Sequence, residues 1–326
     1  MKRLLSIILI LFMLILVFSS VALADRPLVS DEVGSKAYSY IEALTFAPRV
    51  AGTQEEFAAA KMIEQYFSAA GYDTELQPFT FAGGQASQNV IANRAATKKP
   101  KTRPTPLVIV GAHYDSVPGD SGLGGGLGAD DNASGVAVML EVAERIARHK
   151  QEYDLVFVAF GAEEAGLHGS FHYVENMSAP DIDRAIAMIN FDSLIVGDKL
   201  YIHAGSNGKT WARDEMLRLI SLRKLPIEMQ PGLNPHYPAG FTPDWFSDYT
   251  AFNQAGIPIV AFESTNWEIP PDFDGYVQTE CCGSFWHNRE HSDTLATIEE
   301  LFPGRPMIRL NAYTTLVFEF LKHLNL

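Results

Sequence analysis

The 326-residue sequence predicts an α/β fold, a single domain in which a mixed and twisted β-sheet lies between α-helices. One observation behind this is a set of short, unbroken apolar runs at 107–110, 154–160 and 185–191, typical of strands buried on both faces of a sheet. The other is that segments with apolar residues at helical spacing separate these runs. Strands that alternate with helices favour a mostly parallel or mixed sheet with helices on both faces.

Two helices and two outer strands are expected ahead of the first buried strand, the helices at 30–44 and 54–70 and the strands at 73–81 and 89–93. Pro48 follows the first helix and prevents its continuation. Gly71 closes the second, because glycine readily takes the left-handed conformation that ends a helix. Residues 73–81 alternate polar and apolar side chains, as an edge strand does.

The remaining elements lie between the buried strands or follow them. A helix is expected at 136–149, with Ser134 as a candidate N-cap residue because its hydroxyl can accept a backbone hydrogen bond. A fourth buried strand at 257–262 follows the turn at Ala255 and Gly256, and the chain from 295 to its end is mostly amphipathic helix.

The first 24 residues have the parts of a secretory signal peptide, namely the charges of Lys2 and Arg3, an apolar run at 4–18 and a small-x-small cleavage site ending at Ala24. The apolar run is short for a membrane span, so an uncleaved anchor is the less favoured alternative. We expect residues 1–24 to be removed and 25–326 to form the folded domain. The mature protein is then expected to be secreted or periplasmic, without membrane attachment, and monomeric.

The chain is acidic, with 25 lysines and arginines against 39 aspartates and glutamates and a formal net charge of −14. Such a charge argues against nucleic acid or an anionic membrane as a partner, and it suits cationic substrates or divalent metal ions. The two cysteines, Cys281 and Cys282, are adjacent, so no disulfide within the chain joins distant segments. A vicinal disulfide and a pair of buried thiols both remain open.

Polar side chains follow each of the three buried strands. They are His113 and Asp115 after the first, Glu163 and Glu164 after the second and Asp192 after the third, with Asp131 just ahead of the next helix. A single histidine at a strand end is more often a hydrogen-bonded loop residue than a ligand, but the carboxyl ends of parallel strands meet at one edge of the sheet. Histidine and carboxylates without a thiolate suit zinc, with cobalt or manganese as substitutes. This many ligands suit two ions, about 3.5–4 Å apart, bridged by one carboxylate.

Five motifs occur in one order along the chain: His113-x-Asp115-Ser, Gly-Ala-Asp-Asp131-Asn-Ala-Ser-Gly, Gly161-Ala-Glu163-Glu164-x-Gly-Leu-x-Gly-Ser170, Asn190-Phe-Asp192 and Ser247-Asp248-Tyr-x-x-Phe-x-x-x-Gly256-Ile-Pro. Together they resemble the di-zinc aminopeptidases of peptidase family M28, from about Arg49 to the C-terminal helix. The resemblance implies a phosphorylase/hydrolase-like domain and an enzyme that removes the first residue of peptides or proteins with two zinc ions per chain.

The resemblance also implies a role for each strand-end residue: His113 and Asp192 on one zinc ion, Glu164 and a late histidine on the other, Asp131 bridging the two, Glu163 as general base and Asp115 orienting His113. In such a site the base takes a proton from water and passes it to the leaving amine. The acidic residues are also expected to hold the substrate's free α-amino group. A basic N-terminal residue would suit the acidic chain.

The last zinc ligand departs from the family's usual spacing. We favour His287, which follows Trp286, over His291, which lies too close to Asp293. Trp286 stands where many relatives have a tyrosine, so the oxyanion donor stays open. The other histidines without motif support are expected to pack or to lie on the surface; they are His168, His172, His203 and His236. The aromatic residues Trp245, Trp267 and Tyr276 either line a specificity pocket or pack structurally.

Three other functions remain open. A zinc-dependent glutaminyl cyclase has a related fold and uses a single metal ion, and a carboxypeptidase of the co-catalytic zinc class would act on the other end of a peptide. A non-enzymatic binding or receptor relative would be expected to have lost ligands, whereas this chain has the residues that the resemblance requires.

Overall fold

The structure, a computed structural model, describes residues 32–99, 104–118, 126–285 and 291–324. The expected signal peptide at 1–24 and the candidate ligand His287 lie outside these residues. Residues Val33–Leu326 form one compact unit. In the described part of the chain, no helix is both long enough and apolar enough to cross a membrane.

The sheet of the described chain has eight strands, namely β1 (Asp73–Phe81), β2 (Gln85–Arg94), β3 (Leu107–His113), β4 (Asp154–Phe160), β5 (Ala185–Phe191), β6 (Lys199–Ala204), β7 (Ile227–Glu228) and β8 (Ile259–Thr265). Their order across the sheet is β1-β2-β4-β3-β5-β8-β6-β7. The four central strands, β4, β3, β5 and β8, run parallel, whereas β2 is antiparallel to β4 and β6 is antiparallel to β8. The predicted mixed sheet is confirmed.

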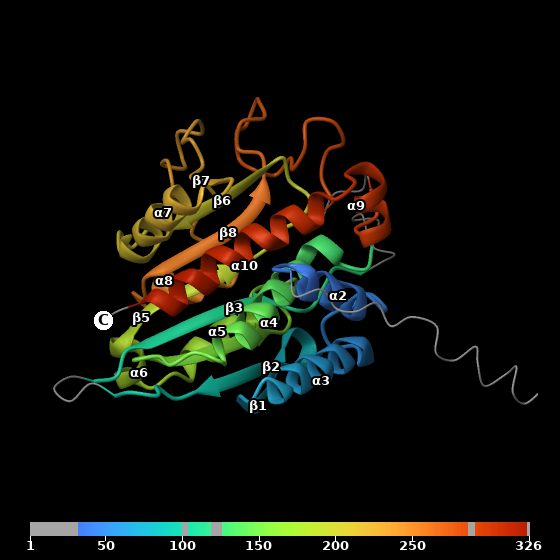
Figure 1. Ribbon diagram of the computed structural model, residues 1–326. Helices are drawn as coiled ribbons and strands as arrows, with labels where there is room; N and C mark the ends of the chain where they lie inside the picture. Colours follow the sequence, from blue (N-terminus) through green and yellow to red (C-terminus); the bar gives the residue numbers. More distant parts are fainter. Residues whose placement is uncertain (1–31, 100–103, 119–125, 286–290, 325–326) are drawn as a thin grey trace, which may run out of the picture. The chain divides into compact units, whose positions relative to one another are not determined.

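Helices cover both faces of the sheet. On the face turned toward the viewer in Figure 1 lie α2 (Ser35–Leu44), α3 (Gln54–Ala69), α4 (Gly135–Ile146), α7 (Trp211–Arg223) and α10 (Arg305–His323). On the other lie α5 (His168–Glu175), α6 (Ala179–Arg184) and α8 (Tyr249–Gln254). A short helix, α9 (Leu295–Leu301), contributes Ile298 to the hydrophobic core on the face that α4 and α10 cover.

Strand β4 shows why an unbroken apolar run forms a central strand. Leu155, Phe157 and Ala159 belong to the core beneath α3, α4 and α10. Their neighbours Val156, Val158 and Phe160 belong to the core beneath α5 and α8. Because successive side chains of a strand point to opposite faces, a strand covered on both sides must be apolar throughout.

Several predicted boundaries are confirmed, and one local prediction is confirmed in position only. Strands β1, β4 and β5 have the expected ends, and Gly71 follows α3 with a φ of 89°. Ser134 does occupy the N-cap position of α4, but its side chain makes no capping hydrogen bond there, and a helical turn, η2 (Ala129–Ser134), precedes the helix. The Ser134 hydroxyl instead donates to Asp130 O at 2.7 Å. Helices α5, α6 and α8 were not predicted, since six to eight residues are too few for a clear helical period.

Candidate metal centre

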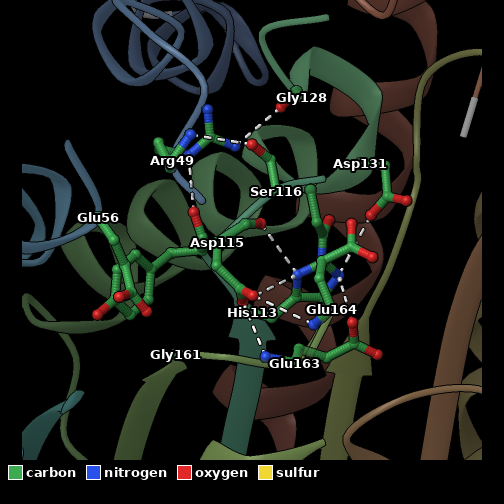
Figure 2. A network of polar contacts seen from close by, with 12 residues as sticks. Arg49, Glu56, His113, Asp115, Ser116, Gly128, Asp131, Gly161, Glu163 and Glu164 are labelled. Carbon is green, nitrogen blue, oxygen red and sulfur yellow. Dashed lines mark hydrogen bonds and ion pairs between the residues drawn. The ribbon is translucent and has the colours of Figure 1, made fainter. Parts of the chain in front are cut away.

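The order of the central strands brings the predicted ligands together. Strand β3 lies between β4 and β5, so the polar residues after all three strands meet at one edge of the sheet. His113 is the last residue of β3 and lies at the centre of the group in Figure 2. Its Nε2 atom is 3.2 Å from Asp131 Oδ1, 3.5 Å from Asp192 Oδ1 and 4.0 Å from Glu163 Oε2.

This arrangement fits a divalent ion. Ligand atoms of His113, Glu163 and Asp192 lie within 4.8 Å of one another. One imidazole nitrogen with several carboxylate oxygens, and no thiolate, is a donor set that zinc accepts. The geometry and the family resemblance differ at one residue. The geometric group contains Glu163, whereas the resemblance implies that Glu164 is the zinc ligand and that Glu163 is the base.

The electrostatics of the group also call for a cation. Burial by itself lowers the pKa of His113, but the charges of Glu163 and Asp192 outweigh it and raise that pKa well above its usual range. Burial raises the pKa of Glu163 well above its ordinary value, although His113 opposes the rise. Buried carboxylates are stable in the ionised form only when a cation or strong donors balance them. A metal ion would supply that positive charge.

Asp115 organises the loop that carries both glutamates. Its Oδ1 atom accepts a hydrogen bond from Glu163 N at 3.0 Å, and its Oδ2 atom accepts one from Glu164 N at 3.1 Å. The expected partner of Asp115 is nearby as well, because His113 Nδ1 lies 3.6 Å from Asp115 Oδ1 and 3.3 Å from Asp115 O. The sequence predicted that Asp115 would contact His113, but not that it would accept hydrogen bonds from the backbone of Glu163 and Glu164.

Asp131 is positioned through two other acidic residues. Asp293 accepts hydrogen bonds from the backbone N–H groups of Asp130 and Asp131, at 2.7 and 2.9 Å. Asp130 in turn accepts from Ile195 N at 2.7 Å and from Gln278 Nε2 at 2.6 Å. Burial raises the pKa of Asp130 to about 7. The sequence indicated only one part of this hydrogen-bond network, namely the acidic residue Asp130 directly before Asp131.

Asp192 is fixed by hydroxyl groups. Ser247 Oγ donates to Asp192 Oδ2 at 2.6 Å, and Ser193 Oγ donates to Asp192 Oδ1 at 3.1 Å. Asn190 Nδ2 donates to Ser247 Oγ at 3.0 Å and so holds that serine in place. Burial raises the pKa of Asp192, but His113 and the hydroxyl donors more than offset it, and the net pKa is lowered.

Arg49 supports the same edge of the sheet from the backbone side. Its guanidinium is fully buried and donates to carbonyl groups of Tyr114, Leu127 and Gly128 at 2.6, 2.6 and 3.0 Å. Figure 2 shows Arg49 above the cluster, beside Ser116, whose Oγ accepts from Arg49 N at 2.9 Å. Arg49 thereby ties the segment after β3 to the one that leads into Asp131.

The remaining histidines have separate places. His291 stacks on Phe285, with ring centroids 5.1 Å apart, and does not line the cavity described below. His168 and His172 pack against Phe81 and Phe79, as expected for packing residues. The assignment of the last ligand to His287 stays a prediction. His203 is buried, as a packing residue would be, but it also lines the cavity.

A cavity of about 510 Å³ adjoins the carboxylate cluster. Its lining includes the candidate ligands, the aromatic residues Trp245, Phe246 and Tyr276, and the acidic residues Glu263 and Asp274. Of the three aromatic candidates from the sequence, Trp245 and Tyr276 therefore line the cavity. Trp267 is buried and packs behind Glu263, to which its Nε1 atom donates at 2.5 Å.

The disulfide alternative for the two cysteines is the one present in the structure. Cys281 and Cys282 are joined to each other in the turn between Thr279 and Gly283.

Comparisons with known proteins agree on one family. The family model described as Peptidase family M28 matches residues 89–301. The chain is 32% identical over 285 residues to the alkaline phosphatase isozyme conversion protein of Escherichia coli (strain K12), across 80% of this chain and 81% of that protein. It is 31% identical over 257 residues to aminopeptidase YwaD of Bacillus subtilis (strain 168), across 76% of this chain and 47% of that protein.

Solved structures share the fold over most of their length. BSAP, a zinc aminopeptidase from Bacillus subtilis, superposes with a TM-score of 0.71 at 18% identity, covering 91% of this chain and 97% of that one. Fimbriiglobus ruber glutaminyl cyclase superposes with a TM-score of 0.66 at 19% identity, covering 92% and 100%. The fold is therefore common to enzymes with two different activities, and the fold alone does not separate them.

Proposed function

The chain belongs to peptidase family M28, and from that premise we propose that it is an exported zinc aminopeptidase that hydrolyses the N-terminal residue of peptides or proteins. The observation that carries this proposal is the convergence of His113, Asp131, Glu163 and Asp192 at the carboxyl ends of adjacent strands, beside a cavity. An N-terminal residue of a peptide is small enough to enter a cavity of about 510 Å³.

The proposed metal content is two zinc ions per chain, which cobalt or manganese could replace. His113 and Asp192 would hold one ion, Glu164 and His287 the other, and Asp131 would bridge them. Zinc bound there would supply Lewis-acid chemistry, by polarising the scissile carbonyl and making a water molecule acidic enough to attack it near neutral pH. A bridging role for Asp131 is consistent with the two backbone hydrogen bonds through which Asp293 fixes its position.

Glu163 is the proposed general base. It would take a proton from the attacking water on its carboxylate and return that proton to the amine that leaves. Its backbone N–H is anchored on Asp115, so the carboxylate is presented from a fixed loop. Proton transfer by a positioned carboxylate typically accounts for about 10²–10⁴ of an enzyme's rate enhancement.

The acidic cluster also explains a restriction to N-termini. A free α-amino group is a cation at neutral pH, and it would be attracted to the same carboxylates that surround the scissile bond. An acetylated N-terminus carries no such charge. The proposal therefore predicts that blocking the N-terminus abolishes cleavage, whereas a carboxypeptidase would still act on a blocked peptide.

Export and substrate preference complete the proposal. The signal sequence at 1–24 would carry the chain out of the cytoplasm, and cleavage would leave a monomer without membrane attachment. A basic first residue would suit the acidic chain. Because a glutaminyl cyclase shares this fold, cyclisation of N-terminal glutamine is the alternative activity.

The test is hydrolysis of unblocked and acetylated peptides of the same sequence, with products identified by mass spectrometry. Release of the first residue from the unblocked peptide alone, prevented by a chelator, is the expected result. Formation of a pyroglutamyl peptide from an N-terminal glutamine, with no amino acid released, would identify a cyclase instead. Absence of any product, with a folded protein that binds peptides, would identify a binding relative.

A further inference from the structure

Glu56 is a buried carboxylate to which the proposed mechanism gives no role. It lies in the first turn of α3 and is fully buried. Its Oε2 atom accepts a hydrogen bond from Gly52 N at 2.6 Å, and its Oε1 atom accepts one from Ser87 Oγ of β2 at 2.5 Å. In Figure 2, Glu56 lies to the left of Asp115, and the candidate ligands lie to the right. Helix capping accounts for the contact with Gly52, but it does not require a buried side chain.

The carboxylate of Glu56 lies against the turn that carries the proposed base. Gly161, which directly follows β4, has no room for a side chain, because an added Cβ atom would lie 2.9 Å from Glu56 Oε1 and 2.6 Å from Gln88 O. Burial raises the pKa of Glu56, and a hydrogen bond from the backbone N–H of Ala162 opposes the rise. Because Glu163 comes next in the chain, Glu56 contacts the backbone directly ahead of the base.

Ala162 has an unusual backbone conformation. Its φ is 53°, in the left-handed region that residues with a Cβ atom rarely occupy. Such a conformation persists only where the surrounding contacts hold it. A change of φ at Ala162 would turn the chain that follows, and Glu163 is the first residue to be displaced. The conformation of Ala162 is therefore tied to the position of the base.

Side-chain acceptors from three parts of the fold hold four consecutive N–H groups of this turn. They are Asn89 of β2 for Gly161, Glu56 of α3 for Ala162, and Asp115 for both Glu163 and Glu164. Each N–H group is fixed separately, so the loss of one acceptor lets the turn shift at that point while the other contacts remain. Glu56 supplies the acceptor on the amino side of the base, and Asp115 supplies the one at the base itself.

We propose that Glu56 is a positioning residue for catalysis, because it fixes the turn at Gly161 and Ala162 that presents Glu163 to the reacting water. This inference rests on the proposed aminopeptidase function, since Glu163 is the base in that function. Glu56 acts through the backbone in this account and transfers no proton. Proton transfer requires the base at hydrogen-bonding distance, so displacement of Glu163 lowers kcat more than it changes KM.

Three substitutions of Glu56 and one matched control test this role. Glu56→Ala removes the carboxylate, and Glu56→Asp keeps the charge but is one methylene too short for the contact with the turn. Glu56→Gln keeps the length and one acceptor oxygen. Glu55→Ala is the control, because Glu55 lies in the same turn of α3 but is exposed.

Hydrolysis of an aminoacyl-nitroanilide gives kcat and KM, and zinc content is measured on the same samples. A displacement of about 1 Å can lower a rate about 100-fold, so we expect kcat to fall about 10- to 100-fold in Glu56→Ala and Glu56→Asp. KM and zinc content should stay near their wild-type values. Glu56→Gln should recover most of the loss, and Glu55→Ala should keep the wild-type kcat.

Two kinetic results would overturn the inference. One is a near-normal kcat in Glu56→Asp, which also decides the matter if Glu56→Ala does not fold. The other is a loss of kcat that matches the loss of folded protein at the assay temperature, because Glu56 would then support the fold alone.

Hydrogen–deuterium exchange tests the contact without turnover. We expect faster exchange of the N–H groups at 161–164 in Glu56→Asp and no change in α10, because only the turn loses an acceptor. If no form of the protein hydrolyses a substrate but exchange rises in this way, the proposed function fails and Glu56 still holds the turn. If substrates are hydrolysed and neither exchange nor kcat responds to Glu56→Asp, the positioning role fails and the function stands.

Discussion

Replacing Asp115 with asparagine tests how the catalytic loop is held. The carboxylate accepts one hydrogen bond on each oxygen, from Glu163 N and Glu164 N. Asparagine has almost the same shape but only one acceptor atom. One of the two backbone N–H groups would therefore face the amide nitrogen and lose its partner in a buried site.

The magnitude follows from these contacts. A hydrogen bond to a charged acceptor contributes about 1.5–3 kcal/mol, and a buried donor without a partner costs about 1–3 kcal/mol. With one neutral hydrogen bond retained, we expect Asp115→Asn to lower the free energy of unfolding by about 2–5 kcal/mol. At about 2.1 cal/mol/K per residue, a unit of this size would lose roughly 3–8 °C in Tm.

The effect on catalysis is expected to be larger than the effect on binding. Glu163 follows the anchored N–H directly, and a displacement of about 1 Å in a reacting group can lower the rate about 100-fold. Thermal unfolding and kcat for an arginyl substrate are measured together, with zinc content determined on the same samples. Glu215→Gln, which alters an exposed ion pair with Arg218 on α7, is the control and should leave Tm nearly unchanged.

Two results would refute this reasoning. If Asp115→Asn unfolds at the wild-type temperature, the two hydrogen bonds do not stabilise the loop as their geometry indicates. If its Tm falls but kcat is unchanged with zinc bound, Asp115 supports the fold without positioning Glu163.

Further predictions concern the base, the metal and a buried carboxyl group. Glu163→Gln should retain two metal ions and lower kcat by about 10²–10⁴, because the base is lost while the proposed ligands remain; near-normal kcat would exclude Glu163 as the base. Prolonged dialysis against a chelator should abolish hydrolysis and lower Tm, and added zinc should restore both; full activity without metal, verified by elemental analysis, would exclude a metal mechanism. Burial raises the pKa of Glu56 to about 7 in the folded protein from an ordinary value of 4.5. The folded state therefore binds more protons than the unfolded state between these values, so stability is lost as pH rises through this window, by up to about 3 kcal/mol relative to Glu56→Gln. Denaturant titrations at pH 5 and pH 8 measure this difference, and a difference that does not change with pH would show that Glu56 ionises normally.

The central part of the fold followed from the sequence because its strands are covered on both faces. Residues 154–160 and 185–191 are apolar at nearly every position, and they form β4 and β5 with the predicted ends. The polar residues after these strands were predictable for the same reason, since they mark where burial ends. Strand β6 and the edge strand β7 carry no such run, and β7 has two residues.

Long-range contacts could not be deduced from the sequence. Asp293 clamps the backbone of Asp130 and Asp131 across 163 and 162 residues of chain, and no local pattern records such a pairing. Asp115 was expected to orient His113, whereas its anchoring of Glu163 and Glu164 depends on how β4 lies beside β3.

Glu263 shows the same limit at the cavity. It follows an apolar run that was correctly predicted to be a strand, yet only the order β5-β8-β6 brings it level with Asp192 and beside His203. The sequence offered His203 as a packing residue, and its burial agrees with that prediction. Its place at the cavity depends on β6, which the sequence did not predict.

The most direct test of the account is the metal content of the purified mature protein, measured by elemental analysis together with release of amino acids from unblocked substrates. The account predicts two zinc ions per chain and release that is lost in step with their removal. A single ion per chain, with cyclised rather than hydrolysed product, would contradict it.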